Sequence, residues 1–234
     1  MSDHQKRLSA PRNYPVERKE GAYVVKADGP YREDEGVPLV VVLRDVLGYA
    51  DTMAEATDVL SSEKLLVNGR TRANPRSNVG FMDVLSFPGL DEHYRVLVTA
   101  DGFALAPVDG DGAGKKLARV DDKTTLKGGV TQLNLHDGNN IETDEEVPTD
   151  SSVLVTLPDL DIEDHVPLEA GNTAYITGGR HVGETATVED VTVQPGSQEN
   201  TVTLEGGDGA FETVESNVYM VGGDAPLLEV AADE

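Results

Sequence analysis

Apolar and polar positions near the start of the chain follow a helical period. The apolar run Pro38–Ala50 predicts one helix, and Pro38 suits its first turn because the amide hydrogen that proline lacks would be unpaired there. A second helix is expected at about Met53–Ser61. Thr52 stands three residues before Glu55, which is the spacing of a capping box. This spacing places the start of the second helix at Thr52.

A shorter period follows these helices. Leu65–Val67 and Arg70–Arg72 flank Asn68-Gly69, and Asn-Gly is the strongest short hairpin signal because both turn positions need positive φ. Phe81–Phe87 is expected to add another strand. Two helices packed against a small sheet, with arginines on the second strand of its hairpin, form a compact scaffold with a basic edge. Such a scaffold suits the recognition of nucleic acid.

Short extended runs and glycine turns fill most of the remaining chain. Strands are expected within residues 94–107, on both sides of a tight turn at 100–102, and again at 130–135 and 153–157. Residues 158–167 are acidic and bounded by prolines, and they predict a link. The runs from residue 168 onward predict a small barrel.

The two ends of the chain show neither period. Residues 1–36 contain prolines, glycines and clustered positive charge, and we expect an arm that becomes ordered only against a partner, with its bases on phosphates. Tyr14 and Tyr23 argue against a merely frayed terminus, because aromatics are uncommon in inert tails. Residues 227–234 are expected to be a disordered acidic tail.

The composition is strongly acidic, with 43 Asp and Glu residues against 19 Lys and Arg residues and a formal net charge of −24. Such a charge argues by default against a polyanionic partner. The charge is uneven, however, because residues 1–32 hold seven Lys or Arg residues against four Asp or Glu residues, and Arg180 is the one base after residue 142. We interpret the acid as adaptation to a concentrated-salt archaeal cytoplasm, where the Debye length falls to about 3 Å at 1 M salt. An ordinary acidic, solubilising surface is the alternative.

Several classes of protein are excluded at this point. No apolar run reaches the roughly 18 residues that would span a membrane. No signal peptide opens the chain, so we expect a cytoplasmic protein with no membrane partner. The chain has no cysteine, which removes disulfides, thiolate zinc sites and cysteine nucleophiles.

Some loops resemble ligand sites but lack the residues that such sites need. Gly114-Lys115 looks like the end of a phosphate-binding loop, but Asp109 and Lys116 stand where that motif requires Gly and Ser or Thr. The two calcium-loop frames, starting at Asp109 and Asp159, lack the required Glu at their twelfth position. His136-Asp137 lies in a turn where neighbouring side chains diverge, and the five histidines show no metal-ligand spacing. We therefore expect no metal site.

Several separate stretches together resemble one family. They are HQKRLSAP at 4–11, VPLVVVLRDVLGYA at 37–50, the hairpin VNGRTR at 67–72, VGFMDVLSFP at 79–88, KGGVTQLNLHDGNNIE at 127–142 and TGGRHVG at 177–183. In this order they resemble the S4e family of archaeal and eukaryotic small-subunit ribosomal proteins, over roughly residues 4–222. The resemblance implies a structural constituent of the small ribosomal subunit that binds ribosomal RNA, performs no catalysis and uses no cofactor.

The resemblance also implies an α+β multidomain fold. The expected domains are a basic N-terminal extension at 1–36, an S4-type RNA-binding domain at 37–100, a central β domain at 101–170, an SH3-like barrel with a KOW motif at 171–222 and an acidic disordered tail at 223–234. The implied partners are small-subunit ribosomal RNA and neighbouring ribosomal proteins, and no homo-oligomer is expected.

The family motifs also indicate which bases would face RNA. They are Lys6, Arg7 and Arg12 in the extension, Arg44, Lys64, Arg70, Arg72 and Arg76 in the S4-type domain, Lys127 in the central domain and Arg180 in the KOW turn; the charge pattern adds Arg18 and Lys19. Alternation along the strand would put Arg70 and Arg72 on one face. The chain departs from the family pattern at Asp34, His181 and Glu184, which weakens the expectation of a direct contact between the KOW turn and RNA.

Two other functions use similar modules. A transcription or translation accessory protein with a KOW barrel would also bind RNA, and its sedimentation with polymerase or as a free protein would distinguish it from a ribosomal protein. An RNA-modifying enzyme with an S4-type domain would need a catalytic carboxylate motif in a large second domain. The short β runs after residue 100 do not offer one.

Overall fold

The computed structural model describes residues 3–196, 198–207 and 209–230, and this part of the chain is mostly β structure with few helices and several sheets. The chain divides into two compact units, the first ending at Gly114 and the second beginning at Lys115. Buried apolar clusters occur in both units. At this level the expected combination of a helical stretch with several small β units is confirmed.

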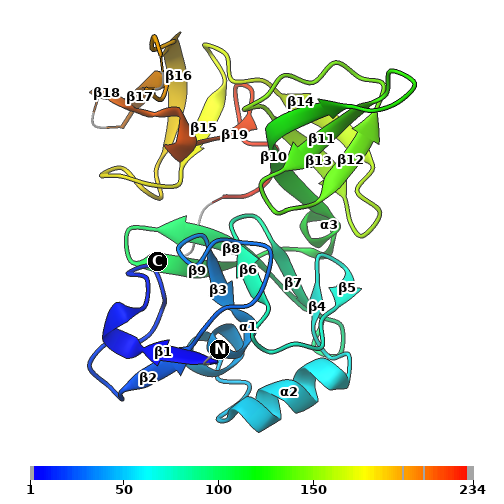
Figure 1. Ribbon diagram of the computed structural model, residues 1–234, viewed down its shortest axis with the longest axis vertical. Coiled ribbons are helices and arrows are strands. Elements are labelled where there is room, and N and C mark those ends of the chain that lie inside the picture. Colours follow the sequence, from blue (N-terminus) through cyan, green and yellow to red (C-terminus); the bar gives the residue numbers. More distant parts are fainter. Residues whose placement is uncertain (1–2, 197, 208, 231–234) are drawn as a thin grey trace. The chain divides into compact units, whose positions relative to one another are not determined.

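A five-stranded antiparallel sheet in the order β5-β4-β7-β8-β9 forms the frame of the first unit (Figure 1). Its strands are β4 (Leu66–Val67), β5 (Arg70–Thr71), β7 (Val84–Phe87), β8 (Glu92–Thr99) and β9 (Gly102–Pro107). The expected turn at residues 100–102 joins β8 to β9, and β9 pairs along its whole length with residues 94–99 of β8. The sheet therefore continues past the domain boundary that was expected after residue 100.

The first predicted helix is shorter than its apolar run. It consists of α1 (Leu39–Val41) and a π-helical turn, η2 (Val42–Val46). The amide of Leu47 donates to the carbonyl of Val42 at 2.9 Å, and Gly48 follows with a φ of 65°. A glycine in this left-handed conformation commonly ends a helix, so the helix stops four residues before the expected end at Ala50.

The second helix and the hairpin form as predicted. Helix α2 (Met53–Ser61) begins after Thr52, whose side-chain oxygen accepts from the Glu55 amide at 3.2 Å. Asn68 and Gly69 have φ values of 51° and 73° and join β4 to β5. The expected strand over 81–87 is interrupted, because Met82 adopts a φ of 68° and β7 begins only at Val84.

The N-terminal segment is packed onto the first unit. Strand β1 (His4–Lys6) pairs with β2 (Tyr23–Val25), and a 3-10 turn, η1 (Arg7–Ser9), follows β1. Tyr14 and Val24 are buried in the core of this unit. The expectation of an arm that is ordered only on a partner is therefore wrong, because burying these side chains already stabilises the segment.

Glycines in the neighbouring strands make room for the end of this segment. Strand β3 (Gly36–Pro38) pairs with β6 (Asn78–Gly80), and the side-chain Nδ2 of Asn78 donates to the carbonyl of Tyr31 at 2.8 Å. A Cβ added to Gly80 would stand 2.5 Å from the Tyr31 ring. Glycine is therefore needed here because the ring lies directly against the backbone. A short helix, α3 (Gly110–Ala113), ends the unit.

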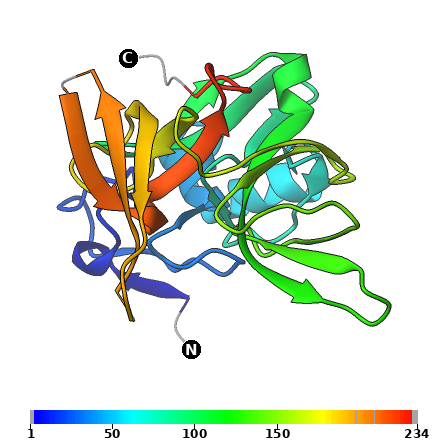
Figure 2. The same cartoon turned by 90° about the horizontal axis from the view of Figure 1, so that it is seen from above.

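Strand β10 (Lys115–Thr125) connects the two halves of the first sheet in the second unit, whose order is β12-β11-β10-β13-β14. Its first half pairs with β13 (Ser152–Thr156) and its second half with β11 (Thr131–Leu135). Strand β12 (Asn140–Thr143) lies at one edge of this sheet. Figure 2 shows β10 and β11 as a long green hairpin. The strands expected at 130–135 and 153–157 are both found, each within one residue of its predicted ends.

The acidic residues 158–167 form more than a link. Strand β14 (Ile162–Val166) pairs with β13 and forms the other edge of the sheet. Ile162 packs against one apolar cluster and Val166 belongs to another, whereas Glu163 and Asp164 between them are exposed. The prediction of a link is therefore wrong. The strand was not recognised because it has only two apolar residues, and the acidic residues between them obscure the strand pattern.

The last folded part is the other sheet of the second unit, also five-stranded and antiparallel, in the order β18-β17-β16-β15-β19. Its strands are β15 (Thr173–Ile176), β16 (Thr185–Thr192), β17 (Thr201–Gly206), β18 (Gly209–Val214) and β19 (Val218–Gly222), with a 3-10 turn, η3 (Glu215–Asn217), before the last. Ala174, Val188, Leu204 and Met220 are among the buried side chains that pack together there. Short strands separated by glycine turns are thus observed from residue 173 onward, as the sequence predicts.

The beginning of the expected disordered tail is ordered. The Leu227 amide donates to the carbonyl of Val221 at 2.8 Å, and Leu228 and Val230 are buried. Because these apolar residues are covered, the described part of the tail does not match the prediction. Residues 231–234 of the predicted tail lie outside the described residues.

Candidate nucleic-acid interface

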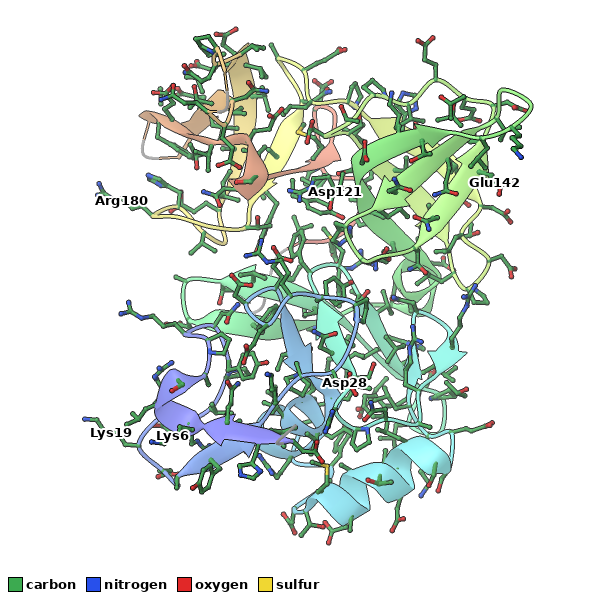
Figure 3. The ribbon with its side chains drawn as sticks, viewed as in Figure 1. Lys6, Lys19, Asp28, Asp121, Glu142 and Arg180 are labelled. Atoms are coloured by element: carbon green, nitrogen blue, oxygen red, sulfur yellow. The ribbon has the colours of Figure 1, made fainter. Side chains whose placement is uncertain are left out.

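The five candidate bases of the N-terminal segment differ in exposure. Lys6, Arg12 and Lys19 are exposed, and Figure 3 shows Lys6 and Lys19 on the same part of the fold. Arg7 is half-buried. The guanidinium of Arg18 donates to three main-chain carbonyls, those of Leu8, Ala10 and Pro11, at 2.6, 2.9 and 3.3 Å. Arg18 therefore closes the loop that precedes it.

The β4–β5 hairpin presents its arginines at the edge of the sheet. Arg70 is an exposed residue of the edge strand β5, and Arg72 is exposed just beyond it. Because β5 ends at Thr71, strand alternation does not fix the direction of Arg72. The expectation that both arginines share one face stays a prediction. Lys64 is also exposed, between α2 and β4.

Two polar side chains hold this hairpin in place. The Asn68 side-chain Nδ2 donates to Asp83 Oδ1 at 2.7 Å, and Asn68 Oδ1 accepts from the Val84 backbone amide at 2.8 Å. Asp83 is 2% exposed and its Oδ2 also accepts from the Gly80 amide at 2.9 Å. The turn that carries Arg70 is therefore fixed to the neighbouring turn of the sheet by satisfied, buried hydrogen bonds.

Two other candidate arginines form ion pairs within the protein. Arg44 pairs with its neighbour Asp45 at 2.7 Å. Arg76 pairs with Asp28 at 3.1 Å and also with Asp3. These ion pairs of Arg76 link the residues just before β6 to the N-terminal segment. The Asp28 backbone amide strengthens the link by donating to the carbonyl of Arg76. These arginines have structural partners already.

The candidate bases of the first unit do not form one cluster. Figure 1 shows β1 and β2 on one side of this unit and β5 on the opposite side. Lys6 on β1 and Arg70 on β5 are therefore presented at separate places. A large polyanion could contact both places, whereas a small ligand could not.

In the second unit, Lys127 and Arg180 are exposed in loops rich in glycine. Lys127 lies at the tip of the β10–β11 hairpin, beside Gly128 and Gly129 with φ values of 104° and 89°. Arg180 lies in the β15–β16 loop after Gly179, whose φ is 85°, and Figure 3 shows its side chain extended from that loop. A ligand that approaches the second unit could therefore contact either side chain.

A buried ion pair joins the start of β10 to the turn that follows β11. Lys116 and Asp137 are 0% and 3% exposed, and Lys116 Nζ lies 2.8 Å from Asp137 Oδ2. The amide and the side chain of Asn139 also donate to the Asp137 carboxylate, at 2.9 and 2.8 Å. Burial alone would raise the pKa of Asp137, but Lys116 and these hydrogen bonds outweigh burial and hold that pKa well below its usual range.

Tyr219 connects the two sheets of the second unit. Its hydroxyl donates to the carbonyl of Leu117 at 2.8 Å and accepts from the Arg119 amide at 3.0 Å. Its ring packs edge-on against His136, with 5.3 Å between the ring centroids. Burial raises the pKa of Tyr219 well above its ordinary value, so the hydroxyl remains protonated and able to donate. A side chain of β19 thereby replaces a strand partner at the edge of β10.

Sequence reasoning missed these internal partners. Lys116 was weighed only as a residue of a phosphate-binding loop, and Asp137 only as a partner of His136. Little in the sequence indicates that Lys116 is buried, because it stands beside another lysine, Lys115, in a strand that also contains Arg119. Its partner was not readable, because residues 116 and 137 meet only through the pairing of β10 and β11.

Other kinds of site find no support in the described residues. Among residues 3–196, 198–207 and 209–230, no group of three or more His, Asp or Glu side chains could hold a metal ion. Within the same ranges, no helix is long and apolar enough to cross a membrane.

Comparisons with known proteins agree with one another. The family model described as Ribosomal family S4e matches residues 90–162, and the RS4NT (NUC023) domain matches residues 1–30. The chain is 42% identical over 223 residues to the small ribosomal subunit protein eS4 of Halobacterium salinarum, covering 94% of this chain and 96% of the relative. It is 38% identical over 232 residues to the protein of the same name from Methanosphaera stadtmanae, covering 98% and 96%.

A solved structure gives the same result for the fold. The crystal structure of the 30S ribosomal protein S4e from Thermoplasma acidophilum matches with a TM-score of 0.71 and 30% sequence identity. The match covers 85% of this chain and 100% of that chain. Sequence and fold thus point to the same relatives over nearly the full length of the chain.

Proposed function

This chain belongs to the ribosomal family S4e, and from that membership we propose that it is a structural constituent of the small ribosomal subunit that binds small-subunit ribosomal RNA. It is not an enzyme, and its place is in the ribosome of the cytoplasm. Its partners are small-subunit ribosomal RNA and the ribosomal proteins beside it. We further propose that it enters the subunit as a single copy, without contact to a membrane.

The distribution of Asp and Glu residues along the chain supports RNA binding. The four longest stretches of the chain without Asp or Glu are residues 4–16, 64–82, 123–136 and 170–183. Each of them contains candidate RNA-facing bases, at Lys6, Arg70, Lys127 and Arg180 among others. Since a carboxylate near a phosphate is repelled, a very acidic protein that binds RNA should lack acid where the RNA lies.

Exposure and a position within one of these four acid-free stretches together reduce the set of candidate contacts. The proposed RNA-facing residues that meet both conditions are Lys6, Arg12, Lys64, Arg70, Arg72, Lys127 and Arg180. Arg18, Arg44 and Arg76 have internal partners, and we assign them to holding the fold. Arg7 is half-buried, and Lys19 is exposed between two glutamates.

The domain assignments are part of the same proposal. An S4-type domain at 37–100 would present the Arg70 hairpin, and the helices and hairpin of the first unit support it. A central β domain at 101–170 would present Lys127. An SH3-like barrel with a KOW motif at 171–222 would present Arg180, which is supported by the five antiparallel strands of that region. The basic extension at 1–36 would contribute Lys6 and Arg12.

Concentrated salt affects how such binding can work. Phosphate contacts weaken steeply as salt rises, because releasing counterions from RNA then yields little free energy. Affinity must therefore come mainly from hydrogen bonds, close fit and several simultaneous contacts. Contacts from both units provide that number, since linked contacts raise each other's effective concentration.

The test removes the hairpin charges. Arg70→Ala combined with Arg72→Ala is expected to reduce incorporation of a tagged chain into small subunits in Halobacterium salinarum, measured by sedimentation of a high-salt lysate. The matched control is Lys26→Ala with Arg32→Ala, which removes two exposed charges outside the acid-free stretches and should leave incorporation unchanged. Normal incorporation of the Arg70 and Arg72 variant would contradict the hairpin assignment. Sedimentation of the unmodified chain apart from subunits would contradict the function itself.

A further inference from the structure

The β15–β16 loop that carries Arg180 is tied down on both sides. At its start, the Thr177 amide donates to the carbonyl of Asn217 at 2.8 Å, and a Cβ on Gly178 would stand too close to the Asn217 side chain. At its end, the Gly183 amide donates to the carbonyl of Ile176 at 2.8 Å. The loop is therefore closed at its base, and Arg180 lies at its far end.

An aromatic stack supports the far end of this loop. The His181 ring lies flat on the ring of Phe211 in β18, with centroids 4.0 Å apart and planes 17° apart. Phe211 in turn packs against the apolar cluster of its sheet, over Gly206, where an added Cβ would stand 3.1 Å from the Phe211 ring. The residue next to Arg180 is thus connected to the core through two rings.

Glu184 fixes the orientation of the His181 ring. His181 Nδ1 lies 3.0 Å from Glu184 Oε2, and since a carboxylate only accepts hydrogen bonds, Nδ1 carries the proton in this pair. His181 and Glu184 are two of the positions at which the chain departs from the S4e pattern. The structure shows that these two side chains contact each other, so the two departures act together.

We infer that His181, stacked on Phe211 and held by Glu184, is a positioning residue that holds the Arg180 guanidinium ready for a phosphate of ribosomal RNA. This inference rests on the proposed function and makes its contact at Arg180 more specific. A flexible glycine loop would have to be ordered on binding, and ordering its backbone costs conformational entropy, which weakens binding. A loop that is already held does not lose this entropy when it binds. The difference matters most where salt weakens the attraction between Arg180 and phosphate.

The test is a double-mutant cycle on the full chain with the small-subunit ribosomal RNA of Halobacterium salinarum, measured by filter binding across a KCl series. Arg180→Ala should weaken binding about tenfold and reduce the slope of log affinity against log salt by about 0.7–0.9. His181→Ala should weaken binding about two- to tenfold. The variant with both changes should bind no more weakly than Arg180→Ala alone, because His181 acts only through Arg180.

Two readouts separate positioning from a general loss of structure. His181→Phe keeps a ring on Phe211 but loses the hydrogen bond to Glu184, so it should bind more tightly than His181→Ala and more weakly than wild type. Binding as weak as that of His181→Ala would contradict positioning through the ring stack. His181→Ala should also reduce the salt slope, as loss of the Arg180 contact does, although far-UV circular dichroism and melting temperature show a folded chain.

The outcomes also distinguish this inference from the function beneath it. If the wild-type chain does not bind the RNA, the proposed function fails. If wild type binds but the losses from Arg180→Ala and His181→Ala simply add, or His181→Ala has no effect, His181 does not position Arg180 and only this inference is overturned. The same holds if Arg180→Ala binds as wild type does.

Discussion

Replacing Asp137 with asparagine should destabilise the second unit by about 3–5 kcal/mol at pH 7, because it leaves the Lys116 ammonium buried without its charge partner. The two side chains are 0% and 3% exposed and lie 2.8 Å apart, so water cannot replace the lost carboxylate. Asparagine keeps the size of the side chain and its carbonyl oxygen. The loss therefore measures the charge of Asp137 and not its packing.

The free-energy cost of deprotonating Lys116 sets an upper limit to this loss of stability. That cost depends on pH. A lysine with the reference pKa of about 10.4 can release its proton at a cost of about 4.6 kcal/mol at pH 7 and about 1.9 kcal/mol at pH 9. The Asp137→Asn variant should therefore lose much less stability at pH 9. In the wild-type chain the lowered pKa of Asp137 acts in acid: its contribution is complete above the unfolded value of about 3.9 and is lost as the pH falls below it.

Urea unfolding at constant KCl, followed by far-UV circular dichroism, measures the loss, and native-state hydrogen exchange of the β10 amides assigns it to the second unit. The control is Lys116→Met with Asp137→Asn, which removes both charges and should recover most of the stability. A loss below about 1 kcal/mol at pH 7, or equal losses at pH 7 and pH 9, would refute the reasoning.

Two further changes probe how each unit is held together. Tyr219→Phe should destabilise the second unit by about 1–3 kcal/mol in the same urea assay, because the buried carbonyl of Leu117 loses its donor, and Tyr23→Phe, on a ring that is 59% exposed, should have no effect. Gly80→Ala should lower the stability of the first unit by about 1–3 kcal/mol, since its Cβ would meet the Tyr31 ring at 2.5 Å. Gly89→Ala meets no atom within 4 Å and should match wild type within about 0.5 kcal/mol; an equal loss from both glycine variants would exclude the Tyr31 contact as the cause.

The features that the sequence predicted well depend on near neighbours in the chain. The capping of α2 by Thr52 and the Asn68-Gly69 turn need only residues a few positions apart, and both are observed. The end of the first helix was placed too late because Gly48 sits inside an apolar run that otherwise continues. Local backbone conformation ended the helix there, although apolar side chains go on to Ala50.

The features that were missed depend on contacts far apart in the chain. Nothing around Tyr31 indicates that its ring will lie against Gly80, and so the N-terminal segment looked like a free arm. Arg76 looked like an RNA contact because Asp3 and Asp28, which neutralise it, are distant in sequence. At the candidate interface, charge pattern and resemblance indicated exposed bases such as Lys127 and Arg180, but they could not tell them from the arginines that hold the fold.

The packing of residues 3–35 on the first unit also affects how the chain matures while it is being made. Polypeptides leave the ribosome from the N-terminus, at roughly 5–20 residues per second. The groups that hold this segment come much later, since Asn13 accepts from the Phe103 amide in β9 and Tyr31 needs Asn78. For several seconds after it emerges, this segment, which has as many acidic as basic residues, is a loose chain beside the ribosome that makes it. The first part to be synthesised is among the last to be finished, and any nascent chain cut short before β9 would leave it open.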